Sequence, residues 1–230
     1  MKAIILAAGM GTRLRPLTND TPKSLVKVAG EPMIERQIKF LKEKGINDII
    51  VVTGYLHEKF EYLKERYSVK LIHNDKYNLY NNIYTMYLVR DYLQDAFVTE
   101  ADVFMVNNFI KTDLEHSTYF AGIKNDFEQE WILQFDENDR IYDIVIEGGT
   151  DYIIAGVSYW TQKDGRIIKE KLEEAIDSRN YKDLYWDNIV QENLNNINLK
   201  ITKVNSDDWF EVDSLEDLDQ ANNYLLSKKL

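Results

Sequence analysis

A glycine-rich segment near the N-terminus is the first part of the sequence that could bind phosphate. Gly9 and Gly11 follow an apolar run, and glycine lets the backbone adopt positive φ and bring several N–H groups close to phosphate oxygens. Arg13, Arg15 and Lys23 come shortly afterwards, as the one concentrated cationic patch in a chain of formal net charge −11. We expect this segment to bind a phosphorylated ligand, although Arg15 is equally consistent with a solvated loop charge.

Two common nucleotide-binding motifs do not fit this segment. The dinucleotide fingerprint requires a third glycine where Leu14 stands, and the P-loop requires a Gly-Lys-Ser or Gly-Lys-Thr string that does not follow. The two glycines alone are also compatible with an ordinary tight turn. The function of the segment therefore depends on the residues around it.

Two aspartates are placed where they could hold a metal ion. Asp102 follows the apolar run 96–99, at the expected carboxyl end of a strand, where open α/β sheets bind ligands. Asp213 lies just before the last helical segment, where its charge could alternatively favour the helix N-terminus. Mg²⁺ beside a nucleoside triphosphate is normally held by one or two carboxylates and by phosphates. The two aspartates together predict a magnesium site.

The aromatic residues of the second half suggest a site for an organic cation. All four tryptophans lie in this half, and Tyr185, Trp186 and Asp187 are consecutive. A quaternary ammonium cannot donate hydrogen bonds, so aromatic faces and negative charge hold it best. The triplet therefore predicts such a site, whereas we expect Trp160, which ends an apolar run, to pack in the core.

Two adjacent asparagines open a predicted helix. The amides of Asn81 and Asn82 can both donate and accept hydrogen bonds at the edge of a nucleobase. Asparagine is also a favoured helix N-cap, and Asn82 could have only that role. We favour contact with the base.

The composition limits the class of protein. The chain has 230 residues, of which 44% are hydrophobic, and contains no cysteine, which excludes disulfides and thiol chemistry. Its acidic charge disfavours nucleic-acid binding, and no apolar run approaches the roughly 20 residues that a membrane span needs. We expect a cytoplasmic protein with small-molecule partners and neither nucleic-acid nor membrane binding. The sequence is compatible with a monomer or a homodimer.

The first half must position these residues on an alternating α/β framework. Apolar runs typical of buried strands lie at 3–7, 49–52, 69–72 and 96–99. Helical patterns lie between and after them, at 32–44, 57–66 and 82–92. This alternation predicts a doubly wound, mostly parallel, Rossmann-like sheet.

The second half has a different pattern. Short strand patterns lie at 119–123, 131–135, 141–146 and 153–160. Helical patterns lie at 163–178, 186–192 and 214–227. They predict a small mixed or antiparallel extension that covers the first half. We expect a single domain over 1–230, with a first half, 1–110, and a second half, 111–230.

The complete N-terminal string is more specific than its two glycines. Residues 6–18 read Leu-Ala-Ala-Gly-Met-Gly-Thr-Arg-Leu-Arg-Pro-Leu-Thr, and Pro22-Lys23 and the string Val-Ala-Gly-Glu-Pro-Met-Ile at 28–34 follow. This pattern closely resembles the signature of nucleotidyltransferases that make activated sugars and alcohols. The resemblance implies that the nucleotide is bound by Leu6, Ala7, Ala8, Gly9, Gly11 and Thr12. It also implies that Arg13 clamps the β- and γ-phosphates and that Lys23 touches the α-phosphate and the acceptor phosphate.

Later segments resemble bacterial CTP:phosphocholine cytidylyltransferases, which are short, single-domain members of that family. The resemblance rests on Glu130-Trp131 and on the segments 155–160, 185–188 and 211–213. It implies CTP and phosphocholine as substrates, with Mg²⁺ held by Asp102 and Asp213. It also implies that 1–110 is a nucleotide-binding half and that 111–230 is an acceptor-binding half, whose extension forms the acceptor site. The implied acceptor site consists of Trp131, Tyr185, Trp186, Asp187 and Glu211.

Three alternatives stay open at this point. A sugar-1-phosphate with UTP, dTTP or GTP would favour polar residues where aromatic ones stand. Phosphoethanolamine or an aminophosphonate is a closer rival acceptor, and the aromatic residues weigh only weakly against it. A non-catalytic regulatory subunit of the same fold would be expected to lose charged site residues such as Arg13 and Lys23, and both are present.

Overall fold

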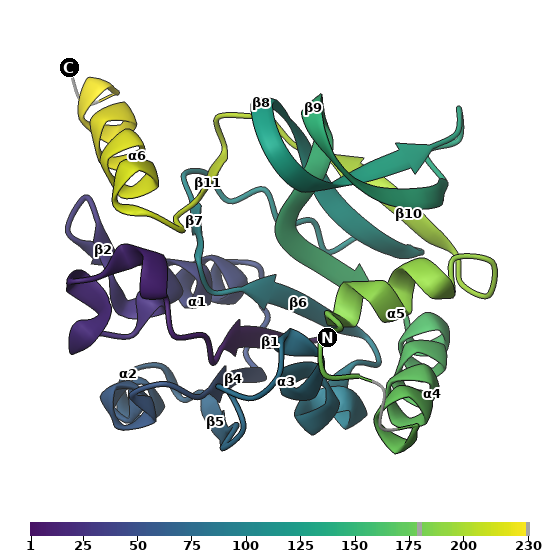
Figure 1. The fold of residues 1–230 in the computed structure, drawn as a ribbon, viewed down its shortest axis with the longest axis horizontal. Helices are drawn as coiled ribbons and strands as arrows, with labels where there is room; N and C mark the ends of the chain where they lie inside the picture. The colour runs from purple at the N-terminus through teal and green to yellow at the C-terminus, as the bar shows by residue number, and fades with distance from the viewer. Residues whose placement is uncertain (179–180, 229–230) are drawn as a thin grey trace.

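A mixed sheet of seven strands forms the centre of the molecule in the computed structural model, which describes residues 1–178 and 181–228 (Figure 1). The strand order is β10-β8-β9-β6-β1-β4-β5. Neighbouring strands are parallel except that β9 runs antiparallel to both β6 and β8. The bounds are β1 (Lys2–Ala7), β4 (Ile49–Thr53), β5 (Lys70–His73), β6 (Ala96–Glu100), β8 (Ser117–Phe135), β9 (Ile141–Trp160) and β10 (Leu199–Lys203). The predicted Rossmann-like sheet with an antiparallel extension is confirmed, and the extension continues the same sheet.

Helices cover both faces of this sheet because its central strands are apolar on both sides. Along β1, Ile5 packs in a cluster with α1 (Met33–Glu43) and α2 (Tyr62–Tyr67). The neighbouring Ile4 packs in a second cluster, with α3 (Asn82–Val89), α4 (Gln162–Asp177) and α5 (Trp186–Glu192). Burying each such side chain contributes about 1.5–3 kcal/mol, so the central strands anchor the fold and hold their carboxyl ends in place.

The antiparallel part differs from the sequence prediction. The four short strands expected between 119 and 160 are two long ones, β8 and β9, which pair along an arm interrupted by register shifts. The polar residues that suggested turns lie at these irregularities, where a bulge bends a strand without ending it. β10 was not predicted, and it joins the edge of the sheet parallel to β8.

Two predicted helices are also shorter than expected. The segment 57–66 contains a 3-10 turn, His57–Phe60, before α2, and the segment 82–92 ends in a 3-10 turn, Arg90–Tyr92, after α3. No helix in the described part of the chain combines the length and the apolar character that a membrane span requires.

Two very short antiparallel pairs complete the fold. They are β2 (Lys27–Val28) with β3 (Glu31–Pro32), and β7 (Val103–Met105) with β11 (Trp209–Glu211). Strands this short have no detectable periodicity, which is why the sequence did not predict them. The second pair brings the end of the chain beside the turn that follows β6.

The last helix, α6 (Leu215–Ser227), begins at a reciprocal capping box. Ser214 Oγ accepts from Asp217 N at 3.2 Å, and the Asp217 carboxylate accepts from Ser214 N at 2.7 Å. The carboxylate also accepts from Asp213 N at 3.0 Å, so the cap fixes the backbone of a predicted metal ligand.

Candidate active site

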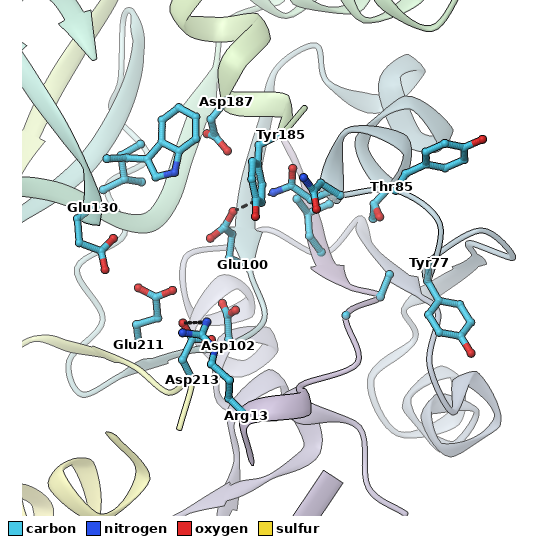
Figure 2. Close-up of a pocket in the computed structure, with 18 of the residues that line it drawn as sticks. Arg13, Tyr77, Thr85, Glu100, Asp102, Glu130, Tyr185, Asp187, Glu211 and Asp213 are labelled. Carbon is cyan, nitrogen blue, oxygen red and sulfur yellow. Dashed lines mark hydrogen bonds and ion pairs between the residues drawn. The ribbon is translucent and has the colours of Figure 1, made fainter. Parts of the chain in front are cut away.

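A single cavity of about 540 Å³ joins the N-terminal loop, the carboxyl ends of β1 and β6, and the second half of the chain (Figure 2). This is the edge at which open α/β sheets bind ligands. Its walls come from both halves of the sequence: Leu6, Ala8, Gly9, Arg13, Tyr77, Tyr80, Asn81, Asn82, Thr85, Glu100, Asp102, Gln129, Glu130, Trp131, Ile154, Tyr185, Asp187, Glu211 and Asp213. Ala7 and Lys23 line a small adjoining hollow, together with Asp102. Gly11 and Thr12 lie in the loop but line neither space.

The glycine-rich loop leaves β1 and turns tightly under the cavity. Gly11 has a φ of +60°, and a Cβ there would lie 2.7 Å from the Cβ of Lys23, so only glycine fits. A Cβ at Gly9 would meet nothing within 4 Å, so this backbone is open to an approaching ligand. Thr18 Oγ1 closes the loop by donating to Gly11 O at 2.7 Å. Short 3-10 turns carry the rest of the loop, at Thr12–Leu14, Leu17–Asn19 and Lys23–Leu25.

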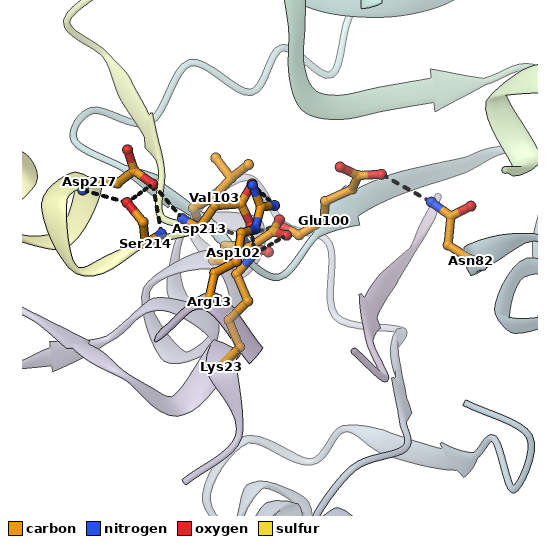
Figure 3. Close-up of polar contacts among 10 residues, drawn as sticks. Arg13, Lys23, Asn82, Glu100, Asp102, Val103, Asp213, Ser214 and Asp217 are labelled. Carbon is orange, nitrogen blue, oxygen red and sulfur yellow. Dashed lines mark hydrogen bonds and ion pairs between the residues drawn. The ribbon is translucent and has the colours of Figure 1, made fainter. Parts of the chain in front are cut away.

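The two predicted phosphate-binding cations are both paired with carboxylates (Figure 3). Lys23 Nζ donates to Asp102 Oδ2 at 2.8 Å and also to Asp213 Oδ1. Arg13 Nη2 lies 2.7 Å from Asp213 Oδ2, and its side chain is 71% exposed. Burial alone would lower the pKa of Lys23, but the charges and hydrogen bonds of the two aspartates raise it well above its usual range. The ammonium group is therefore positively charged in the folded protein.

Three carboxylates converge beside this lysine. Asp102, Glu211 and Asp213 each offer an oxygen, and these oxygens lie within 4.8 Å of one another. The β7–β11 pair brings them together, because Val103 pairs with Glu211 and Val212 N donates to Asp102 O at 3.0 Å.

The trio fits a divalent cation on two observations. Asp102 Oδ1 is buried and has no hydrogen-bond partner in the described part of the chain. Burial raises the pKa of Glu211 well above its usual range, and the neighbouring Asp102 and Asp213 raise it further. Hard divalent cations prefer carboxylate oxygens, and a cation here would relieve both the repulsion and the unpaired oxygen. Glu211, predicted to contact the acceptor, therefore lies in the carboxylate trio.

The far wall of the cavity combines aromatic rings and acids. The ring centroids of Trp131 and Tyr185 lie 6.2 Å apart, with their planes at 74°. Asp187 lies beside them and accepts from Tyr119 Oη at 2.6 Å. Burial raises the pKa of Asp187 from 3.8 to about 6, although the bond from Tyr119 opposes this shift. The pKa of Glu130 is also raised, chiefly by burial. This wall offers aromatic faces and two acidic groups, and Arg13, the basic residue among those that line the cavity, is paired with Asp213.

Trp186 does not belong to that wall, which corrects the prediction that it contacts the acceptor. It is 2% exposed, and its ring packs against Trp160 at 5.5 Å and Tyr119 at 6.4 Å between centroids. As the first residue of α5 it points toward the helical core, whereas its neighbours face the cavity. Trp160, expected in the core, is fully buried, and Trp209 is 1% exposed.

The two asparagines line the cavity but have protein partners. Asn81 Nδ2 donates to Asp183 O at 2.9 Å. Asn82 Oδ1 accepts from Trp186 N at 2.9 Å, and its Nδ2 lies 3.5 Å from Glu100 Oε1. Asn81 stands at the N-cap position of α3 without a side-chain capping bond. Their amides tie the start of α3 to the segment before α5.

Several lining residues were not predicted as site residues, namely Tyr77, Tyr80, Thr85, Glu100, Gln129, Glu130 and Ile154. Glu130 could have been suspected because it precedes Trp131. Burial raises the pKa of Glu100 well above its usual range, followed by the nearby charges of Asp102 and Asp187. The remaining residues belong to no local motif.

The loop, the carboxylate trio and the sheet edge define the class of protein. A family model described as nucleotidyl transferase matches residues 2–126, and the chain belongs to this family. The chain is 45% identical over 217 residues to a choline-phosphate cytidylyltransferase from Streptococcus pneumoniae, covering 94% of this chain and 95% of that protein. It is 41% identical to a choline-phosphate cytidylyltransferase from Haemophilus influenzae, covering 94% of each.

A solved structure of a CTP:phosphocholine cytidylyltransferase from Streptococcus pneumoniae has the same fold. It superposes with a TM-score of 0.95 at 44% sequence identity, covering 97% of this chain and 98% of that one. The agreement over nearly the whole length includes the antiparallel extension as well as the nucleotide-binding half.

Proposed function

We propose that this protein is a cytidylyltransferase that transfers CMP from CTP to phosphocholine and releases pyrophosphate. The observation that carries the proposal is the composition of one cavity. The carboxylate trio and Arg13 of the glycine-rich loop lie at one end, and Tyr185 and Asp187 lie at the other (Figure 2), where Trp131 packs against Tyr185. The relatives in Streptococcus pneumoniae and Haemophilus influenzae support this choice of substrates.

The nucleotide would bind at the loop end. Backbone groups around Gly9 would lie against the base and ribose, and Gly11 and Thr12 would face the phosphates. Arg13 is exposed enough to leave Asp213 and clamp the β- and γ-phosphates, where a forked donor suits paired oxygens. The remaining contacts would come from Leu6, Ala7, Ala8, Asn81 and Asn82.

Mg²⁺ would be held by Asp102 and Asp213, with Glu211 as a third oxygen donor. When bound, it would supply positive charge to the triphosphate and to the leaving pyrophosphate. The protein's own task is to hold these carboxylates close together despite their repulsion, and the β7–β11 pair and the α6 cap achieve this.

The acceptor's quaternary ammonium would bind between Trp131 and Tyr185, with Asp187 and Glu130 as the counter-charges. A quaternary ammonium gains about 0.5–2 kcal/mol from an aromatic face and demands no hydrogen-bond acceptor. The two acidic groups of this wall fit a cationic rather than an anionic head group.

Transfer is a direct displacement in which Lys23 is the main catalytic group. A phosphate oxygen of phosphocholine attacks the α-phosphorus of CTP. The bond from that phosphorus to the bridging oxygen breaks, and the electron pair leaves with pyrophosphate. Lys23 would move from the aspartates to the α-phosphate and the acceptor phosphate, where a positive charge stabilises the crowded transition state. No side-chain nucleophile is required, because positioning and charge neutralisation carry the rate.

Pyrophosphate release tests this proposal. The protein with Mg²⁺ is supplied with each of CTP, UTP, GTP, ATP and dTTP, crossed with phosphocholine, phosphoethanolamine, 2-aminoethylphosphonate and glucose-1-phosphate. We expect release with CTP and phosphocholine and much less with every other pair. Release with a sugar phosphate would overturn the role of the aromatic wall, and release with no pair would favour a non-catalytic subunit. The cytoplasmic location stays a prediction.

A further inference from the structure

Gln37 is a fully buried polar residue on α1 that does not line the cavity. Its Nε2 donates to Val103 O at 2.7 Å and to Glu100 O at 2.8 Å. Its Oε1 accepts from Thr99 Oγ1 at 2.8 Å. The Gln37 side-chain amide therefore makes three hydrogen bonds, two as donor and one as acceptor, and all three partners lie in residues 99–103.

That stretch is the turn that carries Asp102. The two carbonyl groups that Gln37 binds belong to the residues on either side of the Ala101-Asp102 pair, so its amide closes the turn from beneath (Figure 3 shows Glu100, Asp102 and Val103). The turn is held from other sides by Ala101 N, which donates to Leu6 O at 3.1 Å, and by Asp102 O, which accepts from Val212 N.

The neighbouring Arg36 holds the far end of β7 in the same way. Its Nη2 donates to Val106 O at 2.6 Å, its Nε donates to Met105 O, and its Nη1 binds Glu31. Side chains of α1 thus donate hydrogen bonds to backbone carbonyls at both ends of β7: Gln37 at its first residue, and Arg36 at its last residue and the one after it. Of these two ends, the one that Gln37 binds adjoins the carboxylate trio, because Val103 follows Asp102 and pairs with Glu211. A substitution of Gln37 can therefore be studied without disturbing the bonds of Arg36.

We propose that Gln37 is a positioning residue that sets the direction of the Asp102 carboxylate for the divalent cation. The inference rests on the cation site proposed above. The three carboxylate oxygens must stay within one coordination sphere against mutual repulsion, so a small rotation of the turn separates Asp102 from Glu211 and Asp213. Without the amide donors the carbonyls of Glu100 and Val103 lose their partner, and the turn reorients to satisfy them.

The variants Gln37→Met and Gln37→Glu remove the donors while keeping a side chain of similar size. In Gln37→Glu, a carboxylate can still accept from Thr99 but cannot donate to the two carbonyls, so it serves as a second variant if Gln37→Met fails to fold. The matched control is Glu35→Gln. Glu35 is another buried polar residue of α1, but its partners are Tyr62, Tyr67 and Arg66, next to α2.

Mn²⁺ binding is measured directly from the loss of the free-ion electron paramagnetic resonance signal, with nucleotide and acceptor both absent, because the phosphates of CTP would bind the ion themselves. We expect both Gln37 variants to bind Mn²⁺ about 10- to 100-fold more weakly than the wild type, the usual cost of losing a partner that orients a metal ligand. Glu35→Gln should stay within about twofold, because it shares no partner with the turn. Thermal melting of every variant shows that the comparison is made on folded protein.

Asp102→Asn separates the two proposals in the same experiment. If the wild type binds no Mn²⁺, or if Asp102→Asn binds it as tightly as the wild type, the cation site itself is wrong. If Asp102→Asn loses binding while folded Gln37→Glu and Gln37→Met retain it, the cation site stands and the positioning role of Gln37 is overturned.

Discussion

Lys23 and Asp102 form an ion pair in the small hollow that adjoins the cavity, with 2.8 Å between Nζ and Oδ2, and the same ammonium group also contacts Asp213. The lysine predicted to act on phosphates therefore neutralises the carboxylates predicted to hold the cation. In the proposed reaction Lys23 would turn from these carboxylates to the phosphates. Before any ligand arrives, its charge offsets part of the repulsion among the three acids.

Replacing Lys23 by alanine should separate the two roles of its charge. We expect the rate of pyrophosphate release to fall about 10²- to 10³-fold, the usual cost of losing one preorganised group at a developing charge. Mn²⁺ binding without nucleotide should become tighter, because the competing ammonium group is gone. Steady-state kinetics and calorimetric titration measure the two effects.

Arg15→Ala is the control for that variant, because Arg15 is an exposed cation of the same loop. It should leave the rate within about twofold, as expected for a solvated charge. A similar fall in rate for both variants would mean that the general charge of the loop, and not the position of Lys23, carries the effect.

Asp102→Asn should abolish the dependence of the reaction on Mg²⁺ concentration together with most of the activity. Loss of a metal ligand removes several kcal/mol of charge stabilisation, so the rate should fall at least about 100-fold. The matched control is Asp219→Asn, which removes the charge of an exposed aspartate of α6. It should keep the wild-type rate and the Mg²⁺ dependence, as expected for a solvated charge. An active, Mg²⁺-dependent Asp102→Asn would exclude Asp102 as the metal ligand.

Trp131→Ala should raise the KM for phosphocholine much more than the KM for CTP. The loss of one aromatic face is worth about 0.5–2 kcal/mol, or up to about 30-fold in KM. Trp160→Phe, in the buried core, should lower the melting temperature without this selective effect. Equal changes in both KM values for Trp131→Ala would show that the ring supports the cavity as a whole and not the acceptor.

Asp187 should make both stability and acceptor binding depend on pH. Its pKa is raised from 3.8 to about 6 by burial, so the folded protein binds more protons than the unfolded chain between these values. The contribution of this group to stability is therefore present below about pH 4 and is lost as the pH rises through about 6. Asp187→Asn should be more stable than the wild type at pH 7–8, by up to about 3 kcal/mol, and should match it at pH 4.

The same charge should attract the acceptor's cationic head group. In the wild type, the KM for phosphocholine should therefore rise as the pH falls below about 6. Asp187→Asn should show a high KM with a smaller pH dependence, which comes from the phosphate of phosphocholine itself, since its second pKa is also about 6. Urea unfolding across pH 4–8 and steady-state kinetics across pH 5–8 check the two expectations. A wild-type KM that is constant across this range would argue against an ionised Asp187 as the counter-charge.

The alternation of apolar runs and helical patterns was sufficient to predict the central sheet, because strands buried on both faces are apolar at every position. The loop was equally predictable, because its geometry requires a particular residue type. A Cβ at Gly11 would collide with Lys23, so the sequence must have glycine there, and the glycine is visible as a motif. By contrast, the long strands β8 and β9 were wrongly predicted as four short strands, since the polar residues at a bulge are similar to those at a turn. The pair β7–β11 was not predicted, because each strand has only three residues and forms only by hydrogen bonding to the other, which lies about 100 residues away in the sequence.

The site was predictable where it is local in sequence and not where it depends on long-range pairing. Asp102 and Asp213 were placed from their positions at the ends of elements, but Glu211 joins them only through β7–β11. Trp186 was misplaced because consecutive residues at a helix start point in different directions, and no sequence pattern tells which one faces the cavity. Gln37 carries no motif at all, and its importance is visible only from its bonds to the turn 99–103.

Direct observation of the product by ³¹P nuclear magnetic resonance tests the central claim most simply. The protein is incubated with CTP, phosphocholine and Mg²⁺, and the diphosphate resonances of CDP-choline are followed beside the pyrophosphate signal. The proposal predicts that both products form in equal amounts and that neither forms without phosphocholine. Consumption of CTP without a choline-containing diphosphate, or formation of this product by Lys23→Ala at the wild-type rate, would contradict it.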